Sequence, residues 1–291
     1  RFMNPETIVN EICSGSRSDY VSSEPHDYLL ICEQALGQGE PQIVSMFFNR
    51  LNEIEQSIFH FRSAQLQNNA ELAQQHLASA LQISRTKEHR DHLLEARIRM
   101  EWGILRASIG EHEQAGADLR WAMERLGALS EGHRWHGICI LNMAKWHQNR
   151  GELGMALAMH SEISRNGPHH IEIVSISRRN AAELLVAKNH IHSALRNLWI
   201  SHHGFRQTGM IDAAIESGLH WIDLGLSGLN SQAQTMDDAV HNAAPRSVGE
   251  PLPAPEIHPD DLKLMIEWLK TQELDEVGIE LLDEAQDLFQ A

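Results

Sequence analysis

The chain has 291 residues, of which 42% are apolar and 5% aromatic, and it carries a formal net charge of −16 at pH 7. That charge argues against general nucleic-acid binding, which needs a positive field to displace counterions from phosphates. The helix formers Ala, Leu, Glu and Gln are abundant and strand-like alternation is rare, so the sequence predicts an all-α protein with a large core.

The first 40 residues contain two short predicted helices, over residues 5–14 and 26–36, with a polar linker between them. Residues 1–40 therefore form an N-terminal segment that precedes the main array. The chain begins with Arg rather than Met, so we also expect it to be a piece of a longer polypeptide.

Residues 41–244 contain apolar side chains at helical spacing, and the predicted helices fall into consecutive pairs. Pro41 suits a helix start, and the apolar positions after it predict one long helix over residues 42–66. The last pair is degenerate, because Trp221 stands where a small residue is expected. The predicted pairs are 42–66 with 70–83, 89–108 with 111–127, 134–149 with 152–165, 171–187 with 190–204, and 208–226 with 231–243.

Equivalent positions recur around the turns of these pairs, at spacings of 42, 41 and 38 residues. Gly and Asn tolerate positive φ at a turn, and a small residue opposite Ala allows two helices to approach closely. Such a pair cannot bury its apolar face alone, so the pairs must stack. The turn residues are Asn68, Gly110, Gly151 and Asn189, with a fifth turn near Gly228; Phe61, Gly103, Ala144 and Ala182 stand seven residues before, Ala73, Ala115, Ala156 and Ala194 five after, and Leu77, Leu119, His160 and Leu198 nine after.

This order of small residue, turn, Ala and bulky residue resembles the tetratricopeptide repeat over roughly residues 42–205, with a poorer unit to about 244. The spacing exceeds the usual 34 residues, and the longer unit looks more like the repeats of kinesin light chain or of bacterial regulators with extended helices. The resemblance implies a right-handed superhelix of antiparallel helix pairs, a tetratricopeptide-like solenoid. A right-handed α-solenoid outside the family remains an alternative.

The C-terminal part differs from the array in composition and charge. Residues 245–259 are rich in proline and predict a linker, and residues 260–291 predict an acidic amphipathic helical hairpin. From Leu81 to Arg206 there are 17 Lys and Arg against 13 Asp and Glu, whereas from Glu256 onward there are 11 acids against 2 Lys. The apolar stripe of the hairpin must dock on the array, on another protein, or on a second copy in self-association. It either folds back over the groove of the array as an autoinhibitory segment or caps the last repeat.

No GxSxG, P-loop, GxGxxG, HExxH or kinase motif is present. The 19 histidines include His169-His170 and His202-His203, but no local cluster has the complete pattern of a zinc site. The three cysteines are odd in number and far apart, which favours a reducing compartment, and no apolar run is long enough to span a membrane. We therefore expect a non-enzymatic, cytoplasmic protein with no cofactor, no metal and no membrane or nucleic-acid partner.

By the resemblance, the first helix of each pair lines a concave groove, which would be polar and mildly basic in this chain. Arg and Asn at successive repeats can hold the carboxylates and backbone amides of a peptide, so we expect a scaffold that binds a peptide segment or partner protein. The alternatives are that these residues are merely solvated, that the chain is a sensor or regulatory module of a longer polypeptide, and that it is an all-helical toroid enzyme. The expected partner-binding residues are Arg62, Gln65, Arg97, Lys145, Asn149 and Arg179.

Overall fold

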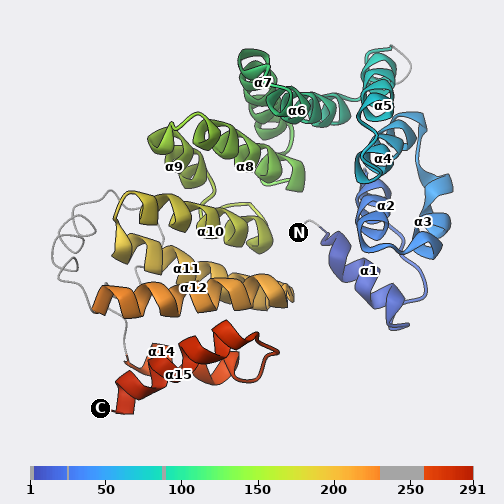
Figure 1. Ribbon diagram of the computed structural model, residues 1–291. Coiled ribbons are helices and arrows are strands. Elements are labelled where there is room, and N and C mark those ends of the chain that lie inside the picture. Colours follow the sequence, from blue (N-terminus) through green and yellow to red (C-terminus); the bar gives the residue numbers. More distant parts are fainter. Residues whose placement is uncertain (1–2, 25, 87–89, 230–258, 291) are drawn as a thin grey trace. The chain divides into compact units, whose positions relative to one another are not determined.

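The computed structural model describes residues 3–24, 26–86, 90–229 and 259–290, and every regular element in these ranges is helical (Figure 1), which confirms the all-α prediction. None of the helices in these ranges has the length and apolar character needed to cross a membrane. The contacts divide the chain into two units, Arg1–Glu131 and Gly132–Ala291, which are described separately. The first contains α1 (Pro5–Cys13), α2 (Asp27–Gln38), α3 (Pro41–Phe47), the 3-10 helix η1 (Phe48–Arg50), α4 (Glu53–Leu66), α5 (Ala70–Ser84), α6 (His92–Ser108) and α7 (His112–Ser130); the second contains α8 (Arg134–Asn149), α9 (Leu153–Glu162), α10 (Ile171–Ala187), α11 (Ile191–Thr208), α12 (Ile211–Leu229), α14 (Pro259–Leu269) and α15 (Glu276–Gln290).

The first unit is built around two antiparallel helix pairs, α4 with α5 and α6 with α7. α5 packs on α6 and joins the two pairs. α2 packs against both α3 and α4, so the predicted N-terminal helices extend the stack. Its largest fully buried side chains include Leu29, Phe47, Phe61, Leu77, Leu94 and Met100.

The prediction of one long helix over residues 42–66 is wrong. α3 ends at Phe47, a 3-10 turn follows, and Leu51 is extended with φ −78° and ψ 135°. Asn52 then starts α4 with a capping box: its Oδ1 accepts from the backbone N–H of Glu55 at 2.9 Å, and its own N–H donates to Glu55 Oε2 at 2.8 Å. These two hydrogen bonds satisfy backbone donors that a helix start leaves unpaired, so they stabilise a new start in the middle of the apolar pattern.

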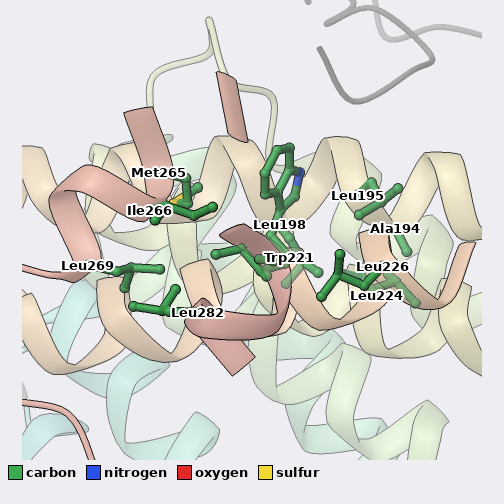
Figure 2. Packing of buried hydrophobic residues seen from close by; sticks show 13 residues of the cluster. Ala194, Leu195, Leu198, Trp221, Leu224, Leu226, Met265, Ile266, Leu269 and Leu282 are labelled. Atoms are coloured by element: carbon green, nitrogen blue, oxygen red, sulfur yellow. The ribbon is translucent and has the colours of Figure 1, made fainter. Parts of the chain in front are cut away.

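The second unit contains the pairs α8 with α9 and α10 with α11, followed by α12, which packs on α11. The predicted C-terminal hairpin is confirmed as α14 and α15, and both helices pack on α12. In Figure 2, Met265, Ile266 and Leu269 of α14 and Leu282 of α15 lie beside Trp221 of α12 in one buried cluster. The acidic hairpin therefore covers the outer face of α12, as a cap does.

The repeat positions predicted from the sequence have the expected conformation and burial. Asn68 and Asn189 have φ of 56° and 60°, and Gly110 and Gly151 have φ of 85° and 75°. The Ala column and the Leu column are buried throughout, with His160 buried in place of leucine. At Gly103, a Cβ would lie 2.7 Å from Cγ of Leu119, so only glycine allows α6 and α7 to pack this closely.

Near residue 228 the structure differs from the prediction. α12 continues to Leu229, so the predicted turn at Gly228 is wrong. A glycine inside a helix costs only about 1 kcal/mol, which the packing of α12 against α11, α14 and α15 offsets. The predicted helix over 231–243 and the predicted linker up to residue 258 lie outside the described residues. The handedness of a superhelix stays a prediction.

Candidate functional site

The expected partner-binding residues of the first unit lie on two helices, in two different settings. Arg62 and Gln65 lie on α4, one turn apart, and Arg62 Nη1 donates a hydrogen bond to Gln65 Oε1 at 3.1 Å. The Arg62 side chain is exposed and Gln65 is half-buried. Both side chains are therefore accessible to a ligand.

Arg97 of α6 is buried and held between two carboxylates. Its Nη2 lies 3.0 Å from Oε1 of Glu33 on α2, and its Nη1 contacts Glu101 one turn further along α6. Burial raises the pKa of Glu33, and the neighbouring Arg97 charge opposes that shift. Buried charges need such partners, so this triad ties α2 to α6 and occupies Arg97 in the packing of the unit.

In the second unit, Lys145 and Asn149 lie exposed on the C-terminal half of α8. Arg179 of α10 is half-buried: its guanidinium carbon lies 5.4 Å from the ring centroid of Phe205, and Nη1 lies 3.2 Å from Glu216 Oε2 on α12. The structure thus links Arg179 to the next helices of the stack, and it leaves Lys145 and Asn149 facing solvent.

One repeat position recurs in both units. Six residues before the turn of each pair, the first helix carries a side chain that is not buried. Three of these side chains are exposed and one is half-buried, and two of the exposed ones are basic. The position is occupied by Arg62, Ile104, Lys145 and Glu183.

A pocket that no pattern in the sequence indicates lies at the junction of the α9–α10 loop, α10 and α11. It has a volume of about 240 Å³. Its wall includes the buried residues Val174, Ile200 and Gly204, and Arg165 provides a positive charge. Asp and Glu are absent from its lining, so among the described parts of the chain it is a place suited to a neutral or anionic group. It is lined by Arg165, Asn166, His169, Ile171, Val174, Ser175, Ile200, His203, Gly204 and Gln207.

Close packing of two helices forms one side of this pocket. A Cβ on Gly204 of α11 would lie 1.9 Å from Oγ of Ser175 on α10. The Ser175 hydroxyl donates to the carbonyl oxygen of Ile171 at 2.7 Å, which keeps it on its own helix. Glycine at this position is the signal in the sequence, but nothing in the sequence shows which residue lies opposite.

The paired histidines of the sequence separate in the structure. His170 caps α10, accepting from Glu172 N–H at 3.3 Å, whereas Nε2 of His169 lies 3.2 Å from Nδ1 of His136. Burial, and secondarily His136, lowers the pKa of His169 to about 4, so this imidazole is neutral at pH 7. Within the described ranges, no three His, Cys, Asp or Glu side chains gather as metal ligands would.

Together these features define an all-α protein of repeated, stacked helix pairs with a helical hairpin docked on α12. No protein-family model matches the chain, and no curated protein matches it. Among solved structures it is similar to BtubC (BKLC) from P. vanneervenii, with 14% sequence identity, a TM-score of 0.52, and coverage of 84% of this chain and 97% of the other. At this identity the similarity shows a shared fold.

Proposed function

We propose that this chain is a non-enzymatic interaction module that binds an acidic peptide segment of a partner protein along the first helices of its pairs. The supporting observation is the repeat-equivalent position at which Arg62 and Lys145 are both exposed and basic. A basic side chain at this position lets the first helix of a pair bind a carboxylate of an extended segment, whereas the other two pairs carry Ile104 and Glu183 there.

The chemistry of Arg62 and Lys145 favours carboxylates. Guanidinium and ammonium groups form charge-assisted hydrogen bonds with carboxylates, and the amides of Gln65 and Asn149 can bind the peptide backbone. A single exposed ion pair contributes only about 0.2–1 kcal/mol, so useful affinity requires several ion pairs between the peptide and the protein. Binding should weaken as salt is added, because exposed charges are screened.

The two remaining arginines have different parts in this proposal. Arg97 serves the packing of the first unit, because its charge is already matched by Glu33 and Glu101. Among the described residues, Arg179 has an ion pair with Glu216, whose side chain is 71% exposed, besides its contact with the ring of Phe205. An exposed pair is weak, so a ligand carboxylate can replace Glu216 on Arg179.

We further propose that the pairs are long tetratricopeptide-like repeats and that the protein works in the cytoplasm. The turn conformations and the buried Ala and Leu columns support the first proposal. The three cysteines Cys13, Cys32 and Cys139 form no disulfide with one another, which supports the second.

The test is capture of partners from lysate by the full chain, with identification by mass spectrometry. The double variant Arg62→Glu, Lys145→Glu should lose partners that the parent captures in a salt-dependent way. The matched control is Arg120→Glu, Lys188→Glu, which makes the same charge change at exposed positions on α7 and at the end of α10. If both variants remain equally helical by circular dichroism and capture the same partners, the first helices are not the binding surface.

A further inference from the structure

The α14–α15 hairpin is seated over a fully buried histidine, His202 of α11. The ring of Trp268 on α14 meets the His202 ring edge-on, with centroids 4.9 Å apart. Gly218 of α12 completes the contact: a Cβ there would lie 3.0 Å from Nδ1 of His202 and 3.1 Å from the sulfur of Met265 on α14. Three helices therefore meet at this imidazole without spare room.

Hydrogen bonding determines the tautomer of His202. Nδ1 lies 2.8 Å from the carbonyl oxygen of Ala214, and a carbonyl only accepts, so Nδ1 carries the hydrogen and Nε2 the lone pair. Nε2 is buried and has no hydrogen-bond partner among the described residues. A second proton would create a cationic ring with a buried N–H that lacks an acceptor, which is costly.

The surrounding charges disfavour this proton further. On α11, the ring of His203 lies 5.1 Å from that of His202, and Arg206 stacks at 4.5 Å over the ring of Trp268. Burial and then these two neighbours lower the pKa of His202 to about 4, against the opposing hydrogen bond to Ala214. The helices packed on it face it with Ala214, Gly218, Met265 and Trp268. Among the side chains whose burial the structure describes, the charged ones are exposed and His220 is half-buried: Asp212, Glu216 and Asp223 on α12, Lys263 and Glu267 on α14, and Lys270 directly after α14.

We propose that protonation of His202 releases the α14–α15 hairpin from α11 and α12, so that the hairpin is a pH-sensitive cap. When α14 lifts, water reaches Nε2 and accepts the hydrogen bond that the docked state denies it. Acid therefore favours the released state, because that state binds the proton more tightly.

The size of the effect follows from linkage. The docked imidazole has a pKa of about 4 and the ordinary value is 6.5. Between pH 7 and pH 5 the docking equilibrium constant should therefore fall on the order of 20-fold, and it should change little above pH 7. Release uncovers the apolar face of α12, including Trp221 and Ile222, and the apolar residues of the hairpin that pack on it.

Hydrogen exchange of the full chain at pH 7 and pH 5, corrected for the intrinsic pH dependence of exchange, tests this proposal. Peptides from α14 and α15 should lose protection on the order of 20-fold at pH 5 relative to pH 7, while peptides from α2 and α4, near His26 with its raised pKa of about 9, keep theirs. Unchanged protection of the hairpin at pH 5 would overturn the proposal.

A non-titrating variant makes the test specific. The glutamine of the His202→Gln variant is polar but takes up no proton. The ratio of hairpin protection at pH 7 to that at pH 5 should therefore fall to about one. The ratio remains informative even if the substitution weakens docking at both pH values. His203→Gln is the matched control, because it changes the neighbouring imidazole on the same helix and should retain the response. A parent-like ratio in His202→Gln, or loss of the response in His203→Gln alone, contradicts the assignment.

Discussion

The imidazole of His160 and the hydroxyl of Ser177 form a buried contact, with Nδ1 and Oγ 3.1 Å apart. The other three helix pairs have leucine at the position of His160. The Ser177 hydroxyl also lies 3.3 Å from the carbonyl oxygen of His160 and donates to it, so Nδ1–H of His160 donates to Ser177. Burial, and secondarily Arg178, lowers the pKa of His160 to about 4. α9 thus packs on α10 through a neutral polar pair.

Replacing this histidine should make the protein less sensitive to acid. The pKa of His160 in the folded protein lies below the ordinary 6.5, so the unfolded chain takes up the proton first as the pH falls. The contribution of this histidine to stability is therefore complete above pH 6.5 and is lost as the pH falls from 6.5 towards 4. In His160→Leu the loss between pH 7.5 and pH 5 should shrink by about 2 kcal/mol. Urea unfolding followed by circular dichroism at the two pH values measures it, and an equal loss in parent and variant would contradict the prediction.

The contact between Gly204 and Ser175 should tolerate no added methyl group. Gly204→Ala places a Cβ 1.9 Å from Oγ of Ser175 and should destabilise the protein by about 1–3 kcal/mol, because α10 and α11 must move apart. Adding Ser175→Ala removes the nearest atom and should restore part of the loss, although the Ser175 Cβ remains 3.2 Å away.

Gly154→Ala is the matched control for that substitution. Gly154 also lies in a helix, but no atom lies within 4 Å of its Cβ position. This change should be neutral or stabilising by about 0.5–1 kcal/mol, because Ala favours a helix more than Gly does. Thermal unfolding of the three variants gives the comparison, and equal effects of the two Gly→Ala changes would count against close packing at Gly204.

The buried triad of the first unit should show a large cost for losing its cation and a small one for losing all charges. Arg97→Met leaves Glu33 and Glu101 buried without a partner and should cost about 3–5 kcal/mol. Combining it with Glu33→Leu and Glu101→Leu should recover most of that loss, as uncharged replacements of buried ion networks often do. Urea unfolding of both variants tests this, and a single variant within about 0.5 kcal/mol of the parent would show that Arg97 is dispensable for packing.

His26 should give the first unit the opposite pH dependence. Its Nδ1 lies 2.8 Å from Glu55 Oε1 and its Nε2 3.2 Å from Asp91 Oδ2. Burial alone would lower the pKa of His26, but the hydrogen bonds to Asp91 and Glu55 outweigh it and raise the pKa to about 9. The stabilisation is therefore complete below pH 6.5 and is lost as pH rises through 9.

The variant for this prediction is His26→Asn, because His26 has φ of 68° and Asn tolerates that conformation. The parent should lose roughly 3 kcal/mol of stability between pH 6.5 and pH 10, and the variant should lose much less over the same range. Hydrogen exchange of α2 and α4 peptides follows the first unit directly. A parent whose α2 and α4 are equally protected at both ends of the range would refute the raised pKa.

Local signals explain which parts of the fold could be predicted. Asn68 and Asn189 adopt positive φ, as the choice of Asn at a turn indicates, and the Ala column is buried in every pair, as its recurrence after each turn indicates. The apolar spacing continues through the break before α4 and hides it, although the Asn52-x-x-Glu55 capping signature marks the new helix start. The turn predicted near Gly228 rested on that glycine and on Ala233 five residues later, and the packing around α12 overrides the preference of glycine for a turn.

The candidate site was harder to predict because its members are distant in sequence. Arg62 and Lys145 follow from the repeat position and are exposed as expected of first-helix residues. The burial of Arg97 depends on Glu33, 64 residues earlier, and no local pattern indicates that pairing. The pocket near Ser175 is formed by a loop and two helices, so it appears only once α10 and α11 are packed together.

The position of the hairpin on α12 also limits how this chain can change in length during evolution. Solenoids gain and lose whole repeats easily, because each repeat contacts only its neighbours. Here α14 and α15 already cover the face of α12 on which a further pair would stack. A duplicated pair inserted before Ile211 would leave this contact intact, because each new unit meets a helix face like the one that it displaces.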